Sequence, residues 1–291
     1  MTQFVDIFGN GLADGCIYAL IGLGLVLLQM TTGVINFAQG DLMSLGCALA
    51  FVLLVRVGMG QVGTFVLVLL MMFGAGIVLE RVGYFPLRKR SPMTIMISTF
   101  ALGLGIEAAL TLWLGSSPLS VPSPFGTNVV HVFGGTISEQ DVFTMIITVI
   151  VFALLFGLLH FTPLGRQVRA LASDREAALL QGIRARSLSA LMFGLSAALA
   201  GLAGMLVGPL LTFTPTLGFG LLLNTFAAVV LGGMDRLGGV VLAALGVAVV
   251  TALASGYISA NYGSAYPYII LLLALMIRPQ GLIRSVSGAR Y

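Results

Sequence analysis

Residues 142–161 read VFTMIITVIVFALLFGLLHF, a continuous apolar run without Asp, Glu, Lys or Arg. About 20 mostly apolar residues are needed for a helix to cross a hydrocarbon core of roughly 30 Å, so this stretch predicts a membrane-spanning helix. The runs are continuous and do not alternate, which indicates helices and not a β-barrel. Similar runs lie at about 8–29, 35–55, 61–80, 92–114, 188–211, 238–258 and 264–278, with a shorter one at about 221–234. We therefore predict an all-α polytopic membrane protein, with about 8 transmembrane helices plus a short broken or re-entrant helix, as a single domain over residues 1–291.

The composition excludes a soluble protein. Charged residues make up 8% of the 291 residues, against about 25% in ordinary soluble domains. The mean hydropathy is +1.09. So few charges cannot cover a soluble surface, which excludes soluble enzymes, disordered chains and nucleic-acid-binding modules. Cys16 and Cys47 lie in apolar stretches and offer no disulfide framework or CxxC metal site.

The 14 basic residues predict the orientation. They cluster in residues 81–90, 166–186 and 278–290, with Arg236 after the short segment. If all segments cross, every basic residue except Arg56 falls on one side, and the positive-inside rule makes that side cytoplasmic. The N-terminus is then outside and the C-terminus inside, with residues 115–141 as an outside loop. If the short segment is re-entrant instead, the later crossings change.

The segment 162–187, TPLGRQVRALASDREAALLQGIRARS, predicts a short cytoplasmic helix over 174–181. Ser173 precedes Glu176 at the spacing of a capping box, and Gly182 is placed to end the helix. So short a helix is marginal in water and needs a surface to pack on. That surface is either the protein's own bundle, the lipid, or a groove on another protein.

The spacing of Glu176-Ala177-Ala178 and Gly182 resembles the EAA-x3-G signature of permease subunits of bacterial ABC importers. In those proteins the signature marks a coupling helix that sits in a cleft of the cytoplasmic ATPase. The positions around Met192 and Phe193 depart from the longer consensus. The resemblance implies that the ATPase is contacted by Arg175, Glu176, Ala177, Ala178, Leu179, Gly182 and Ile183.

Three further stretches resemble branched-chain amino-acid permeases of the LivH type. They are GVINFAQGD (33–41), PTLGF (215–219) continuing to LGGM (231–234), and RPQGL (278–282). They follow the order of that family along the chain. Two departures are visible, because Gln39 stands where His is usual and Asp41 where Glu is usual.

This resemblance implies the partners. The chain lacks the GxxxxGK[ST] motif of a phosphate-binding loop, and its only lysine, Lys89, follows no glycine-rich loop. We therefore predict that this chain is not an enzyme and binds no cofactor. ATP and Mg are expected to bind to partner subunits. The resemblance implies a second permease of similar fold, two cytoplasmic ATPases and a periplasmic binding protein in a bacterial inner membrane, with no nucleic acid. It also implies branched-chain or hydrophobic amino acids as substrates, with urea, short amides or other small carboxylates as alternatives.

Two other classes remain open at this stage. An ion-coupled secondary transporter needs ionisable groups at membrane depth, and Asp14 and Glu107 are the candidates. An intramembrane enzyme has little support, because His131 and His160 lie in a loop and at a span end and no HExxH or GxSxG motif is present.

Polar residues inside apolar segments are candidates for the translocation path. Those at the start of the second span can line a cavity, bend a helix or bind a neighbour. The stretch from Thr212 to Gly220 is either an ordinary turn or the start of a half-helix whose positive end faces an anionic group. The candidates are Asn36, Gln39, Asp41, Thr216, Asn224 and Thr225.

Overall fold

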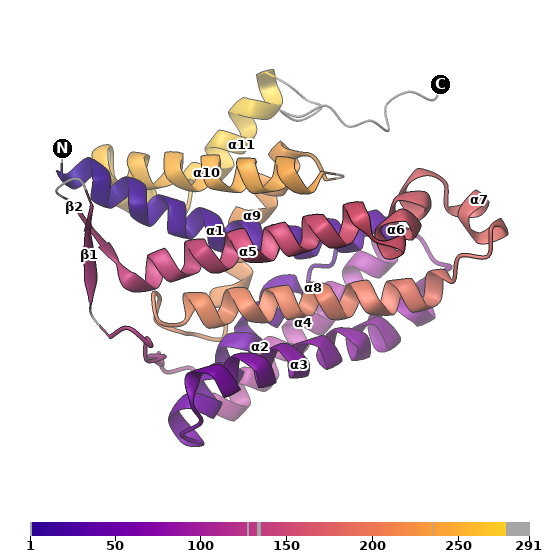
Figure 1. Ribbon diagram of the computed structural model, residues 1–291, viewed down its shortest axis with the longest axis horizontal. Coiled ribbons are helices and arrows are strands. Elements are labelled where there is room, and N and C mark those ends of the chain that lie inside the picture. The colour runs from indigo at the N-terminus through magenta and orange to yellow at the C-terminus, as the bar shows by residue number, and fades with distance from the viewer. Residues whose placement is uncertain (1, 127, 133–134, 235, 278–291) are drawn as a thin grey trace.

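The computed structural model describes residues 2–126, 128–132, 135–234 and 236–277, so the run at 278–282 and the basic residues of the tail lie outside the described part. The helices pack into one bundle (Figure 1). Three of them are mostly buried, and the outer helices around them expose apolar side chains. Among the 18 consecutive residues of α1 that are most apolar, 89% are buried, against 22% in the corresponding stretches of α4 and α5. The inner helices are α1 (Thr2–Thr32), α2 (Gln39–Phe51) and α8 (Ala185–Val207), and the outer ones include α3 (Gln61–Leu79), α4 (Pro92–Leu114), α5 (Glu139–Phe161) and α10 (Leu237–Tyr257).

Seven helices in the described part are long and apolar enough to cross a membrane. Two further apolar helices are shorter, α9 (Leu217–Gly232) and α11 (Tyr266–Ile277). The all-α membrane architecture is therefore confirmed, with α9 as the short segment. The last predicted crossing has only 12 described helical residues. Short π and 3-10 turns extend α2 (Val52–Arg56) and α3 (Glu80–Tyr84, Phe85–Leu87), and one follows α10 (Ala260–Tyr262).

Glycines allow the inner helix α1 to pack at close range against the outer helix α10. A Cβ atom added at Gly15 of α1 would lie 2.8 Å from the Leu245 Cα atom of α10, and one at Gly11 would lie 2.9 Å from the Ala252 Cβ atom. Apolar surface gives little drive between helices in lipid, so this close backbone approach is how such bundles hold together.

The chain leaves helical geometry within the bundle at two places. After α1 it turns at Gly33, where φ is +71°. Helix resumes only at Gln39, four residues later than the apolar run at 35–55 suggests, because the side chains of Thr32 and Asn36 bind the backbone N–H groups of Val34 and Ala38. Residues 208–216 form the second break, between α8 and α9.

The predicted outside loop contains an unpredicted hairpin. Strands β1 (Val129–Val132) and β2 (Gly135–Ser138) are antiparallel, with Val130 opposite Ile137. The Thr136 N–H donates to the Asp6 carboxylate at 2.5 Å, which ties the hairpin to the start of α1. The first half of the loop is held by a β-bridge between Leu119 and Phe213.

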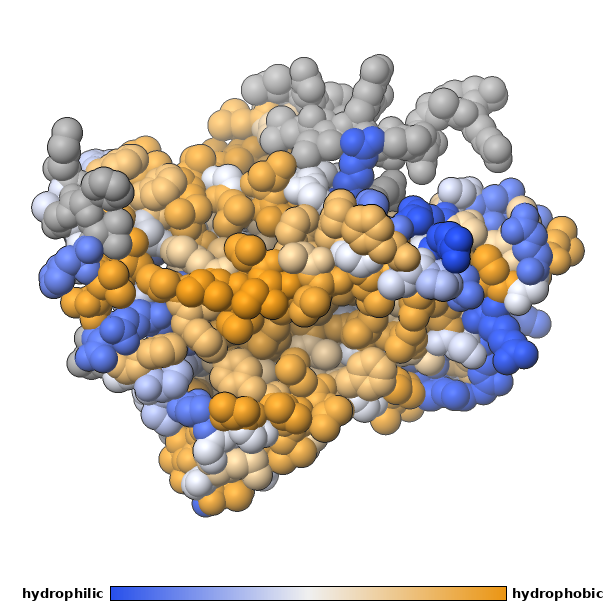
Figure 2. Space-filling model, in the orientation of Figure 1, coloured by the Kyte–Doolittle hydropathy of each residue, from blue (hydrophilic) through white to orange (hydrophobic). Residues whose placement is uncertain are grey.

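The molecule has two polar ends and an apolar middle. Hydrophilic residues gather at the hairpin end and at the end that carries α6 (Pro163–Ser173) and α7 (Arg175–Leu180), while the surface between them is apolar (Figure 2). This band is the surface that a membrane requires.

Candidate functional site

Helix α7 is capped by an aspartate. The Asp174 Oδ1 atom accepts hydrogen bonds from the Glu176 and Ala177 N–H groups, both at 3.0 Å. The predicted cap, Ser173, is wrong, because Ser173 is the last residue of α6 and already has helical geometry. The predicted helix over 174–181 is α7, and a second helix that was not predicted, α6, precedes it and ends at Ser173.

Gly182 ends α7, as predicted. Its φ is +82°, a conformation that side chains with a Cβ atom rarely adopt. The Gly182 N–H donates to the Leu179 carbonyl at 3.0 Å, and the Ile183 N–H donates to the Ala178 carbonyl at 3.2 Å. These bonds satisfy carbonyl groups at the helix end and turn the chain into α8.

Helix α7 projects from the bundle (Figure 1). It exposes apolar side chains to the surroundings. Ala178 is buried, but Leu179 is 48% exposed and Leu180 is 89% exposed. A hollow of about 470 Å³ lies beside the α7–α8 connection, lined by Gln181, Gly182 and Ile183 among others. An exposed leucine on a short capped helix at a polar end is a surface suited to a protein partner.

Arg175 links α7 to the transmembrane helices. Its Nη1 atom donates to the Thr31 carbonyl in the last turn of α1 at 3.3 Å, and its Nη2 atom donates to the Tyr84 hydroxyl at 3.4 Å. Tyr84 is buried in the π turn that extends α3. A displacement of α7 is thereby connected to α1 and to the α3–α4 connection.

The starts of α2 and α9 meet inside the bundle. The Gly218 N–H donates to the Ser44 hydroxyl at 2.9 Å, and Gly40 contacts the carbonyl group of Gly218. The Ser44 hydroxyl therefore satisfies one of the free N–H groups at the start of α9. This junction brings together the helix starts that follow the two non-helical stretches, residues 33–38 and 208–216.

Gln39 joins α2 to the other two inner helices. It is fully buried, and its Nε2 atom donates to the Ser196 carbonyl at 3.0 Å. The Ser196 hydroxyl lies 2.9 Å from both the Gly24 carbonyl and the Gln39 Oε1 atom. Sequence reasoning identified Gln39 from its place in an apolar run, but it missed Ser196 and Gly24.

The remaining path candidates point to different neighbours. Asp41 is buried against Gly103 of α4, and the Asn224 Nδ2 atom donates to the Tyr18 hydroxyl at 3.3 Å. Asn36 and Thr225 are buried, whereas Thr216 is exposed at the start of α9. Among the described residues, the Asn36 Nδ2, Asp41 Oδ1 and Thr225 Oγ1 atoms have no hydrogen-bond partner. The structure thus does not gather the six candidates around one cavity, and their role in a path stays a prediction.

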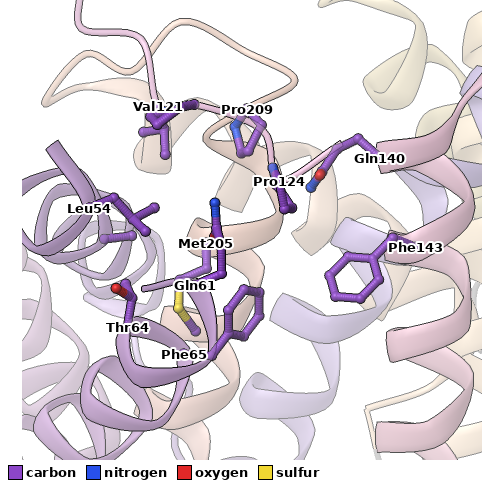
Figure 3. Close-up of a pocket in the computed structure, with 12 residues that line it drawn as sticks. Leu54, Gln61, Thr64, Phe65, Val121, Pro124, Gln140, Phe143, Met205 and Pro209 are labelled. Carbon is purple, nitrogen blue, oxygen red and sulfur yellow. The ribbon is translucent and has the colours of Figure 1, made fainter. Parts of the chain in front are cut away.

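A small pocket closes the hairpin end of the bundle. Figure 3 shows Phe65 of α3 and Phe143 of α5 beside Met205 of α8, with Pro124 and Pro209 above them. Gln140 closes one side, because its Nε2 atom donates to the Leu206 carbonyl at 3.2 Å. The cavity of about 10 Å³ has room for about one water molecule, so it is no substrate site. Within the described ranges, no three His, Cys, Asp or Glu side chains come together to hold a metal ion.

Comparisons with known proteins agree with this arrangement. Residues 7–277 match the family described as the permease component of the branched-chain amino acid transport system. The chain is 29% identical to the high-affinity branched-chain amino acid transport system permease protein LivH of Escherichia coli, over 96% of this chain and 95% of that one. It is 31% identical to the corresponding protein BraD of Pseudomonas aeruginosa, over 94% of each.

A sugar permease and one solved structure are also similar. The chain is 29% identical to the ribose import permease protein RbsC of Escherichia coli, over 95% of this chain and 79% of that one. The PsaBC structure from Streptococcus pneumoniae, in complex with Fab, shares the fold with a TM-score of 0.51 at 12% identity. That likeness covers 93% of this chain and 91% of the other.

Proposed function

Because the chain belongs to the family of branched-chain amino acid transport permeases, we propose that it imports branched-chain or other hydrophobic amino acids as the membrane subunit of an ATP-driven importer. The observation that carries this proposal is the family match over residues 7–277. The family is a permease component, so ATP hydrolysis belongs to partner subunits. The helical membrane architecture agrees with that role.

The substrate proposal rests on the relatives. LivH and BraD, whose names state branched-chain amino acid transport, match over about 95% of their length, whereas the ribose permease matches over 79% of its own. No observation favours urea, short amides or another small carboxylate. The ion-coupled alternative also gains no support, since Asp14 is exposed on α1 and Glu107 is half-buried on α4, and no hydrogen bond or ion pair among the described residues joins the two carboxylates.

The partners that we propose are ATPase subunits, a substrate-binding protein and a second permease of similar fold. Support for the ATPase contact comes from α7, whose half-exposed Leu179 and hydrogen-bonded ends form a projecting surface. We assign the contact to residues 175–179, 182 and 183. Two ATPases, one for each permease, would give each projecting helix its own cleft.

The end that carries α7 is proposed to face the cytoplasm of a bacterial cell. Basic residues of the α3–α4 connection and of the start of α8 lie at this same end, since the Arg88 and Arg186 guanidinium groups are 4.0 and 4.4 Å from the Phe85 ring centroid. The start of α1 lies at the opposite end with the hairpin (Figure 1). The positive-inside rule then places the N-terminus outside.

The proposed mechanism is alternating access. ATP binding closes the ATPase pair and displaces α7, and Arg175 passes this displacement to the end of α1 and to Tyr84. At the junction of α2 and α9 the chain is not one continuous helix, and its close packing would pass a displacement of one segment to the other. The substrate path lies between the two permeases. It is open to one side of the membrane at a time, and the displacement switches the side to which it is open.

The test is uptake of radiolabelled leucine into vesicles that contain the purified full complex. We expect uptake by complexes whose α7 faces the vesicle interior. This uptake should require ATP inside the vesicle and the binding protein outside it. Uptake by this chain alone in response to a proton gradient, with no need for ATP, would overturn the proposal and favour an ion-coupled transporter.

A further inference from the structure

The ring of Phe85 is surrounded by guanidinium groups at the α7 end of the bundle. The Cζ atoms of Arg88 and Arg186 lie 4.0 and 4.4 Å from the ring centroid, and that of Arg81 lies at 6.0 Å. A guanidinium group stacked on a ring is held in one orientation, while the N–H groups at its edge stay free to bind an anion. Phe85 therefore serves as a platform that presents arginines.

Arg88 and Arg186 line a hollow of about 520 Å³, which we call the arginine pocket. One wall is the α3–α4 connection with Tyr84 and Phe85, and the other is the end of α7 with Leu179 and Ile183. The lining contains no Asp or Glu. Its four arginines are Arg88, Arg175, Arg184 and Arg186.

Little in the described part of the chain neutralises this charge. The one ion pair found among the described residues joins Arg81 to Glu80 at 3.7 Å, and Glu80 is fully buried with its other oxygen bound by the Ser189 hydroxyl. Several cations around one hollow repel each other, and an anion placed between them removes that repulsion. Arginine binds phosphate groups through two parallel N–H···O bonds, so a phosphate group is the anion that fits best.

The surroundings favour a phosphate that is attached to a lipid. Just before the pocket in sequence, Val78 and Val82 are 62% and 58% exposed, and just after it Met93 and Ile97 are 70% and 57% exposed. Figure 2 shows the hydrophilic residues of this end directly bordering the apolar band. A ligand here can place its charge among the arginines and its hydrocarbon along α3 and α4.

We propose that the arginine pocket binds the headgroup phosphate of an anionic phospholipid. The lipid's acyl chains lie on the outer surface of α3 and α4, and its phosphate joins the α3–α4 connection to the base of α7. The site goes beyond the import function. Its lining shares Arg175, Leu179 and Ile183 with the proposed ATPase contact, and its placement in the cytoplasmic leaflet, which is rich in anionic lipid, rests on the proposed orientation.

Lipid binding by the full chain, purified in detergent, tests the proposal by native mass spectrometry. The probes are phosphatidylglycerol, phosphatidylcholine and inorganic phosphate. The pocket variant is Arg88→Gln with Arg186→Gln. Its matched control is Arg90→Gln with Arg166→Gln, which removes two exposed charges from the same end but outside the pocket. We expect the wild-type chain to bind phosphatidylglycerol in preference to phosphatidylcholine, and the pocket variant to bind it roughly tenfold or more weakly.

The control variant should keep phosphatidylglycerol affinity within about twofold of the wild type. A Phe85→Leu variant keeps every charge but removes the platform, and it should also weaken binding. Equal binding of both lipids, or equal weakening in control and pocket variants, would overturn the proposal. Full displacement of the lipid by millimolar inorganic phosphate would also overturn it, because that result marks a soluble-anion site. So would a pocket variant that binds lipid normally but no longer assembles with the ATPase, because that result marks a pocket for acidic ATPase side chains. The readout involves no transport, so the import function can fail while this proposal stands.

Discussion

Substitution of Gly40 by alanine should destabilise the junction between α2 and α9. A Cβ atom at Gly40 would lie 2.7 Å from the Gly218 carbonyl carbon and 2.8 Å from the Leu222 Cβ atom, closer than real Cβ contacts come. Two of the three nearest atoms belong to backbone, which cannot rotate away. Overpacking of this kind costs about 1–3 kcal/mol.

Gly220 on α9 provides the matched control. A Cβ atom there meets nothing within 4 Å, so alanine should be neutral or should stabilise the helix by up to about 1 kcal/mol. We therefore expect the free energy of unfolding of Gly40→Ala to fall about 2 kcal/mol below that of Gly220→Ala. The measurement is unfolding of the purified chain in mixed detergent micelles, followed by circular dichroism.

The partner substitution, Gly218→Ala, checks that the contact itself is responsible. Its Cβ atom would meet the Gly40 carbonyl group and would lie 2.5 Å from the Ser44 hydroxyl that binds the Gly218 N–H. Because both substitutions disturb one contact, their effects should not add. Equal stability of Gly40→Ala and Gly220→Ala would refute the reasoning, since the two helix starts would then not be in contact.

Three further predictions concern the two candidate sites. Asp174→Ala removes the acceptor of two N–H groups and should cost α7 about 0.5–2 kcal/mol, seen as faster hydrogen exchange over 175–180, while Asp174→Asn should largely preserve protection. Gln39→Ala removes the buried hydrogen bonds to the Ser196 carbonyl and hydroxyl and should lower stability by about 1–3 kcal/mol in the same micelle assay; an unchanged value would contradict its role in joining α2 to α8. Arg175→Ala loses its bonds to Thr31 and Tyr84 and should leave ATP hydrolysis intact while leucine uptake per ATP falls; a proportional loss of both would argue against a linking role.

The spans could be predicted because lipid demands long continuous apolar runs. α4 has the predicted bounds, 92–114, and α5 begins three residues before the predicted 142. Hydropathy does not reveal the late start of α2, because Val34, Ile35 and Phe37 are as apolar as the residues of a helix in lipid. What stops the helix there is side-chain bonding by Thr32 and Asn36, which hydropathy does not detect.

The α7 region was predicted in part. Gly182 has a clear signal, since few other residues adopt its φ. α6 was missed although Thr162-Pro163 is a helix start and Leu164, Val168 and Leu171 follow at helical spacing. The hairpin was also missed, although Val129-Val130 and Gly135 offered β-branched residues and a turn.

The long-range partners had no local signal. Gln39 contacts Ser196 across 157 positions, and Arg175 contacts Thr31 across 144. A single sequence carries no trace of such pairs. The EAA-x3-G spacing identified which helix to examine, and only the fold shows what that helix is attached to.

Leucine uptake by the reconstituted complex with Glu176→Lys tests the central claim, that α7 receives the energy of ATP hydrolysis. Glu176 is exposed on α7, and its substitution leaves the Asp174 cap and the bundle unchanged. Arg90→Glu, an exposed charge reversal at the same end, is the control. The account predicts that Glu176→Lys inserts normally but loses ATP-driven uptake, while the control retains it. Normal ATP-driven uptake by Glu176→Lys would contradict the account.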